Sequence, residues 1–397
     1  MTTRSTEDAG DGAAGQSRPP TLAALLIATF LAFVNYAALL PVVPMWAADG
    51  GAGSVVVGSV TGAMMTATVL TQLSMPWLFR HLSLRTMVVA GSALLGAPTP
   101  LYALSAETSA ILAITVIRGI GFAFVVIAGA IVAAEIAGPG KLSSYSAYYG
   151  AAAALPNVGA LAGGVWAADV FGYTAVFAVA GAASLCGAFV ACWLPGRLRG
   201  RFAVPSAGDV RPIAIPIIVF LMIAGAFGAA TTFLPLAGPT AATVAFALLA
   251  ASAALVAGRL LAGFVGDRRG AGRLLVPSAL IGALGCLLIS LSLDGPTWLL
   301  VLGAGLLGLG FGSSQNDSFV LTMQRLGTGR SGTASIIWNI AYDGGLGLGA
   351  VGFGWFVGTL GYAGAFIAMC SAIVAVALLC ARFVSAQRGR PLREGDA

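Results

Sequence analysis

Two aspartates stand inside long apolar stretches of the second half of the sequence, each with an amide on the same helical face. Asn339 and Asp343 are four residues apart, and Ser313, Asn316 and Asp317 stand at i, i+3 and i+4. A carboxylate removed from water favours its protonated form, so it can bind a proton on one side of a membrane and release it on the other. We therefore expect Asp343, near the middle of its stretch, to couple proton movement, with Asp317 as the second candidate. The alternative for Asp317 is a static ion pair with a later arginine, Arg325 or Arg330.

In the first half, Arg118 lies in the middle of an apolar stretch. An arginine at the centre of a membrane helix costs about 2.5–3.5 kcal/mol on insertion scales, so it normally faces a partner or a wet cavity. We expect Arg118 to face the cavity, with Asn35 and Gln72 as further polar groups there. The alternatives are a structural arginine bonded to carbonyls of the next helix, and amides that only join helices.

Composition indicates the elements that hold these side chains. Charged residues make up 9% of the 397 positions and hydrophobic ones 58%, whereas soluble domains carry about 25% charged residues. One membrane-spanning helix needs about 20 mostly apolar residues. Twelve such stretches are present, which predicts an all-α integral membrane protein with spans near 21–46, 55–78, 86–104, 108–135, 145–167, 172–194, 212–236, 240–265, 274–293, 296–324, 332–357 and 362–385.

The longest connection divides the spans into six and six. It covers 195–211, and a weak repeat agrees with this division, because IRGIGFA at 117–123 resembles LLGLGFG at 306–312. Such a parallel repeat is typical of one large class of transporters. We expect two pseudo-symmetric six-helix bundles with a linker and disordered cytoplasmic tails, in the order 1–20, 21–194, 195–211, 212–385 and 386–397.

The basic residues predict the orientation. Of the 20 Lys and Arg residues, all but Arg118 and Arg259 fall in the tails or in every second loop. Basic residues accumulate in cytoplasmic loops, so both termini are expected in the cytoplasm and the protein in the cell (inner) membrane. The net charge of +6 is then a topology signal and does not indicate nucleic-acid binding.

After the eighth predicted span comes the segment GFVGDRRGAGR, which starts at Gly263. It resembles the G-x-x-x-D-R-x-G loop signature of the major facilitator superfamily, and the equivalent first-half segment (76–85) departs from that pattern. An acid beside arginines on a tight turn can form charge-assisted bonds to neighbouring helix ends and so hold one conformation. The residues expected to form this gating loop and its contacts are Gly263, Asp267, Arg268, Gly270, Arg273, Arg259 and Glu135.

Two further segments resemble motifs of the same superfamily. Arg118 matches an arginine that the family links to proton coupling. In the fifth span, Pro156 and Gly159 match the antiporter-type motif G-x-x-x-G-P-x-x-G-G, although Leu155 replaces its second glycine. Proline and small residues permit a bend and close packing there. These resemblances imply the superfamily fold and its drug-efflux-like branch.

The leading hypothesis is a secondary transporter that works by alternating access and exports a small hydrophobic or amphipathic compound in exchange for protons. The alternative is a proton symporter that takes up a sugar or another small nutrient. A more distant alternative is an integral-membrane enzyme, for which clustered acids or histidines would be needed. The expected partners are the small-molecule substrate, H+ and the lipid bilayer, with a monomeric chain and no cofactor, metal or nucleic acid.

Overall fold

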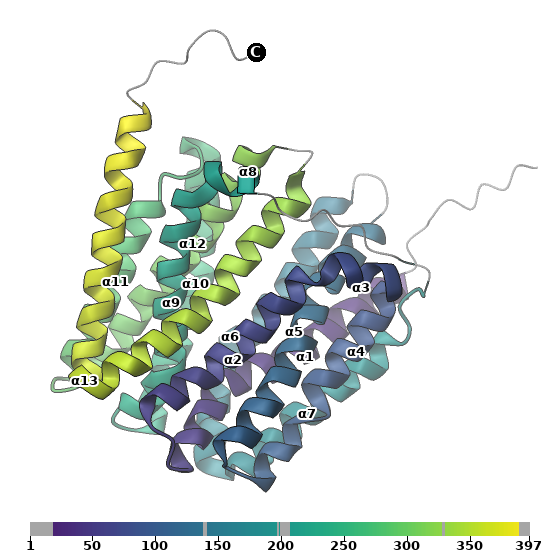
Figure 1. The fold of residues 1–397 in the computed structure, drawn as a ribbon, viewed down its shortest axis with the longest axis horizontal. Coiled ribbons are helices and arrows are strands. Elements are labelled where there is room, and N and C mark those ends of the chain that lie inside the picture. Colours follow the sequence, from purple (N-terminus) through teal and green to yellow (C-terminus); the bar gives the residue numbers. More distant parts are fainter. Residues whose placement is uncertain (1–18, 138–140, 197, 199–206, 328–329, 389–397) are drawn as a thin grey trace, which may run out of the picture.

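The computed structural model describes residues 19–137, 141–196, 198, 207–327 and 330–388. Within these ranges the chain is helical and contains no strand. Almost all of the predicted tails, and most of the predicted linker, lie outside the described residues. The described helices stand side by side in two groups, with purple-to-blue helices on the right of Figure 1 and green-to-yellow helices on the left.

The first group carries the helices up to residue 191, namely α1 (Pro19–Asp49), α2 (Ser54–Leu73), α3 (Met75–His81), α4 (Leu84–Gly96), η1 (Thr99–Leu104), α5 (Thr108–Glu135), α6 (Leu142–Phe171) and α7 (Tyr173–Ala191). The second group consists of α8 (Ala207–Val210), η2 (Arg211–Ile213), α9 (Ala214–Ala237), α10 (Ala241–Arg269), α11 (Leu275–Ser292), α12 (Trp298–Leu326) and α13 (Ser331–Arg388). We call the end of the molecule where α1 begins and α8 lies the linker end.

The third predicted span is not one regular helix. It starts as α4 and finishes as the 3-10 segment η1, with Pro98 and Pro100 at the change. Proline lacks an N–H and clashes with the preceding turn, so an α-helix cannot continue unchanged through both residues. The chain still crosses as one apolar unit from Leu84 to Leu104.

Helix α13 contains two crossings. The described residues include eleven helices long and apolar enough to span a membrane, and the last of these covers 49 residues. At 1.5 Å per residue such a helix would be about 74 Å long, more than twice the hydrocarbon thickness of about 30 Å. Gly361 interrupts it with a φ of 69°, a backbone conformation that favours glycine. Figure 1 shows the two legs of α13 meeting at a sharp bend. The predicted twelve spans in two six-helix bundles are therefore confirmed.

Glycines allow close contact between the two groups at the end opposite the linker end. A methyl group on Gly58 of α2 would collide with the carbonyl of Ala350 on α13. One on Gly354 of α13 would collide with the carbonyl of Ser54 on α2. The hydroxyls of Thr61 on α2 and Thr232 on α9 add a hydrogen bond of 2.8 Å between the groups. This seam of α2 with α13 and α9 closes the molecule at that end.

Candidate functional site

A cavity of about 170 Å³ lies between the two helix groups, with walls from α1, α5 and α6 on one side and α9, α10, α12 and α13 on the other. Most of its lining is apolar. Its polar lining residues include Asn157, Arg259, Gln315, Asn339 and Asp343.

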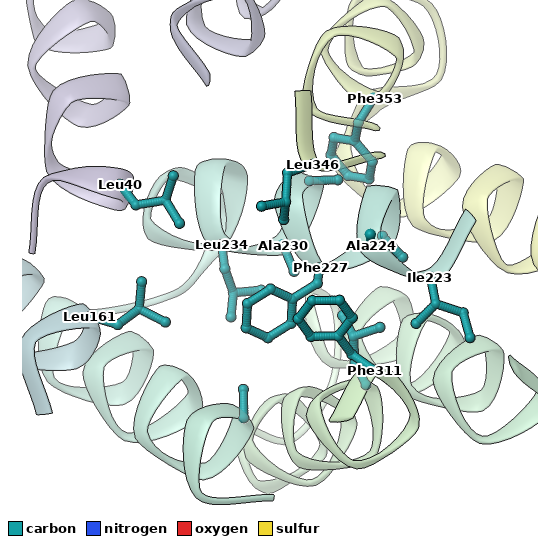
Figure 2. Packing of buried hydrophobic residues seen from close by; sticks show 14 of the residues in the cluster. Leu40, Leu161, Ile223, Ala224, Phe227, Ala230, Leu234, Phe311, Leu346 and Phe353 are labelled. Atoms are coloured by element: carbon teal, nitrogen blue, oxygen red, sulfur yellow. The ribbon is translucent and has the colours of Figure 1, made fainter. Parts of the chain in front are cut away.

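Three leucines form the floor of the cavity at the end away from the linker. Helices α1, α6 and α13 all begin at the linker end, and on each of them the lining residue farthest along the chain is a leucine: Leu40, Leu161 and Leu346. Figure 2 shows these side chains within an apolar cluster that also contains Phe227 and Phe311. We call the three residues the leucine floor. Because they belong to both helix groups, relative motion of the groups would open or close it.

Asp343, on α13 of the second helix group, lines the cavity and contacts the first helix group. Its Oδ2 accepts a hydrogen bond of 2.7 Å from Nε2 of Gln72 on α2, and both side chains are buried. This bond joins α13 of the second group to α2 of the first. Asp343 and Asn339 both line the cavity, as their four-residue spacing predicts. Asn339 itself bonds back to the carbonyl of Ser335 on its own helix, at 2.7 Å.

Aromatic rings make up much of the cavity wall. Tyr36 stacks on Phe122 with ring centroids 4.0 Å apart. On the opposite side, Trp338 stacks on Phe220 at 4.8 Å and donates its indole N–H to Ser318 at 3.0 Å. The indole is therefore fixed, whereas the buried hydroxyl of Tyr36 has no hydrogen-bond partner among the described residues. Flat apolar faces of this kind can pack against an apolar part of a ligand.

Arg118 lies outside this cavity lining, inside the first helix group. Its guanidinium donates to the Asn35 side-chain oxygen at 3.1 Å and to the Tyr102 hydroxyl at 3.2 Å. Asn35 in turn donates to the carbonyl of Ala180 at 2.8 Å, and Tyr102 bonds to Thr115 at 2.7 Å. The network ties α1, η1, α5 and α7 together around a buried cation with neutral partners. The predicted placement of Arg118 and Asn35 in the cavity is not what the structure shows.

Asp317 also has a different environment from Asp343. Its two carboxylate oxygens accept hydrogen bonds from the backbone N–H groups of Gly272 and Leu274, at 2.7 and 2.9 Å. The carboxylate thus holds the turn between α10 and α11, whereas the alternative considered from the sequence was an ion pair with Arg325 or Arg330. Arg325 instead donates to the carbonyl of Pro212 at 2.8 Å.

The gating-loop residues form a tight turn. Gly270 and Gly272 both have positive φ, 85° and 84°, which explains why glycine occupies these two positions of the turn. Arg268 stacks over the Phe264 ring at 3.9 Å, and Arg273 donates to the carbonyl of Arg269 at 3.0 Å.

The other predicted contacts of this loop differ. Asp267 and Glu135 are exposed. The predicted gate contact Arg259 lines the cavity. Asn316 lies next to Gly263 of the loop. A Cβ atom added at Gly263 would be 3.8 Å from Nδ2 of Asn316, which is an ordinary van der Waals distance. Of the predicted acids, the one that holds the turn is therefore Asp317.

The fifth-span motif forms part of α6. Pro156 lies inside this helix, and the neighbouring Asn157 bonds to the carbonyl of Ala153 at 3.1 Å while it lines the cavity. A methyl group on Gly159 would meet nothing within 4 Å, so this glycine makes no close helix contact here. Gly164 does, because a methyl group there would collide with the carbonyl of Ala38.

Sequence reasoning missed two cavity groups. Gln315 lines the cavity where Asn316 was expected. Arg259 was assigned to the gate, yet it provides the cavity with a cation on the same surface as Asp343. A residue's position within an apolar stretch gives its depth, but the sequence does not show which face of the helix meets the other half.

Known protein families and solved structures share this architecture. Residues 25–350 match the family model of the Major Facilitator Superfamily. The chain belongs to the major facilitator superfamily. It is therefore a multi-pass membrane protein with the fold of a secondary transporter.

Solved structures of this fold resemble the whole chain at low sequence identity. A mutant form of the nucleoside transporter NupG is 15% identical, with a TM-score of 0.75, and covers 91% of this chain and 99% of its own. A POT family transporter in complex with a thioalcohol-conjugated peptide is 11% identical, with a TM-score of 0.73 and coverages of 94% and 99%. A bacterial homolog of the human lysosomal transporter Spinster, inward-facing and occupied, is 15% identical, with a TM-score of 0.71 and coverages of 93% and 96%. No curated protein matches the sequence.

Proposed function

We propose that this transporter exports a small hydrophobic or amphipathic compound from the cytoplasm and that protons moving the other way drive it. The observation that carries the proposal is Asp343. It is the only acidic residue of the described cavity lining, and its hydrogen bond with Gln72 crosses between the two helix groups.

Such a carboxylate suits proton coupling for two reasons. It lies in apolar surroundings, where its neutral form is favoured, so loading and release of a proton change its hydrogen bonding substantially. The Gln72 amide donates to the carboxylate in the present arrangement. Protonation would weaken that bond between α2 and α13 and so favour a different arrangement of the two groups.

The lining of the cavity supports the choice of cargo. Stacked rings and aliphatic side chains dominate it, with one anion and one cation, Asp343 and Arg259. Burying several charges of a cargo without partners here would cost several kcal/mol. An apolar compound with one small polar group fits these walls better than a sugar or a multiply charged nutrient. The resemblance of the α6 segment to the antiporter-type motif, with Pro156 and Gly159, also favours export.

Transport in proteoliposomes tests the coupling. The vesicles receive an imposed pH gradient and a panel of fluorescent amphiphiles without titratable groups, which cannot be trapped passively by acid. We expect gradient-driven accumulation for the wild type. Asp343→Asn, which keeps the size and removes the proton site, should lose it and keep exchange of preloaded compound.

Asp317→Asn is the matched control, because this acid binds a turn and not the cavity. It should retain a response to the gradient. Full gradient-driven accumulation by Asp343→Asn would overturn the assignment of the coupling residue. Accumulation with the reverse sign of the gradient dependence would instead identify a proton symporter.

A further inference from the structure

A second hollow lies on the membrane-facing surface of the transporter, next to the central cavity. It is a groove of about 640 Å³ between α1, α6 and the α10 residue Val256. Its lining is almost entirely apolar and consists of Leu26, Ile27, Phe30, Leu31, Tyr148, Ala151, Ala152, Ala154, Leu155, Val158 and Val256. We call it the α6 groove.

The α6 groove and the central cavity share part of their walls. Ala154 and Val158 of α6 and Val256 of α10 line both hollows. The seam between α6 and α10 is therefore only one layer of small or medium side chains thick. Gly150 lines the cavity beside this seam, and a methyl group placed there would meet nothing within 4 Å.

The position of the α6 groove fixes which half of the membrane it faces. Its α6 residues run from Tyr148 to Val158, about 15 Å at 1.5 Å per residue. Helix α6 begins at Leu142 and α1 at Pro19, both at the linker end, so the groove lies in the half of the span near that end. A surface at that depth meets lipid acyl chains.

A second apolar groove serves as a comparison. It lies between α1, α6 and α7, and it is lined by residues such as Val34, Ala160 and Val179. None of its lining residues lines the central cavity. An apolar hollow on this surface is thus not unusual in itself, and the shared wall distinguishes the α6 groove.

We propose that the α6 groove is a lateral entrance through which a single-chain amphiphile passes from the membrane leaflet at the linker end, between α6 and α10, into the central cavity. The proposal rests on the function argued above, because it names the route and the chemical form of the cargo. The chain of the amphiphile lies along the groove, in surroundings as apolar as the lipid it leaves. Its small polar head reaches polar groups of the cavity beyond the seam, among them Asn157, Arg259, Asn339 and Asp343.

The seam suits passage by a cargo of this shape. A head group moving sideways through a lipid-facing wall must avoid long exposure to the hydrocarbon, since an unpaired polar group there costs several kcal/mol. Ala154 and Val158 leave only a thin barrier before the first cavity amide, Asn157. Lateral access also removes the need for the chain to enter water first.

Photolabelling of the full-length protein in phosphatidylcholine vesicles tests the route. The probes are a dodecylamine that carries a diazirine in its chain, which partitions into the membrane, and a water-soluble butylamine diazirine. Adducts are mapped by peptide mass spectrometry to the groove and to the cavity residues Phe122 and Trp338. In the wild type we expect the long probe to label both hollows.

Ala154→Trp fills the seam, and Ala160→Trp on the same helix fills only the comparison groove. We expect Ala154→Trp to lose cavity labelling by the long probe to background, to keep groove labelling, and to keep cavity labelling by the short probe. Ala160→Trp should behave like the wild type. Retained groove labelling shows that the Ala154→Trp protein is folded, and Val158→Phe provides a second variant of the same seam.

Cavity labelling by the long probe that persists in both seam variants would overturn the lateral entrance. So would its absence from the wild type, or an equal loss of labelling by both probes. Labelling is measured without a proton gradient, so its outcome does not depend on whether Asp343 couples transport to protons. A failure of proton coupling and a failure of the lateral entrance are therefore distinguished.

Discussion

Arg118 is a buried cation whose hydrogen-bond partners are neutral. Its guanidinium reaches the side-chain oxygen of Asn35 and the hydroxyl of Tyr102, and its Nε has no partner among the described residues. The Tyr102 ring also lies 5.6 Å from the guanidinium carbon. Asn35 and Tyr102 stand on α1 and η1, so Arg118 on α5 fixes the irregular end of the third span against two neighbours. This geometry favours a structural role over direct contact with cargo.

Replacement of Arg118 tests that role. Arg118→Ala should lower the free energy of unfolding by about 1–3 kcal/mol, because the buried oxygen of Asn35 is left without its donor. The free energy of unfolding of Arg118→Lys should lie between those of the wild type and Arg118→Ala, since an ammonium group cannot reproduce the planar fork that reaches two acceptors. Thermal unfolding in detergent measures both. Unchanged stability combined with loss of gradient-driven transport would contradict the structural role and support the coupling role that the family resemblance implies.

The sequence predicted the pairing of Asn339 with Asp343 correctly, because residues four apart share a helix face whatever the helix packs against. It could not predict where a shared face points. Asp317 lies in the tenth predicted span, yet its carboxylate faces the turn at Gly272 and Leu274. The bond from Gln72 to Asp343 joins residues 271 positions apart. Such a contact depends on how the two halves pack, which no local pattern encodes.

At the level of elements, the turn between α10 and α11 depends on a carboxylate from α12. Asp317→Ala should free the amides of Gly272 and Leu274 and cost about 1–3 kcal/mol for each lost acceptor. We expect faster hydrogen exchange at both amides. Asp267→Ala is the matched control, because Asp267 is the exposed acid of the same motif. Equal acceleration in both variants would show that Asp267 holds the turn as well.

The seam of α2 with α13 depends on close backbone contact. Gly58→Ala places a methyl group against the carbonyl of Ala350, and such overpacking costs about 1–3 kcal/mol. The conformation in which this seam is closed should become less populated. Hydrogen exchange should then be faster in the parts of α2 and α13 that lie at the end opposite the linker end. Gly352→Ala on α13 is the control, because a methyl group there meets nothing within 4 Å. Slow exchange retained in Gly58→Ala would mean that the seam relaxes without opening.

Helix boundaries followed from hydropathy except where backbone chemistry intervened. The eleventh span was predicted to end near 357 and the twelfth to start near 362. The break in α13 falls between these positions, at Gly361. The change from α4 to η1 was not predicted, although Pro98 and Pro100 were visible in the sequence. Hydropathy detects the apolar stretch and not its hydrogen-bond pattern, so a 3-10 ending leaves it unchanged.

For the whole molecule, the number of crossings and the side on which the chain ends are linked. Twelve crossings return the end of α13 to the linker end, where α1 begins. Arginines of the described residues also lie at that end of the chain path, namely Arg211, Arg268, Arg269, Arg273, Arg325 and Arg330. Basic residues mark the cytoplasmic side, so the linker end should be cytoplasmic.

Fusions of green fluorescent protein and alkaline phosphatase test both statements, because the first fluoresces only in the cytoplasm and the second is active only outside. A fusion to the full chain should fluoresce and lack phosphatase activity. A fusion to a chain that ends at Leu360, before the break at Gly361, has lost one crossing and should show the reverse. Fluorescence in both would mean that α13 does not cross twice. Phosphatase activity of the full-length fusion would invert the orientation, and the α6 groove would then face the outer leaflet.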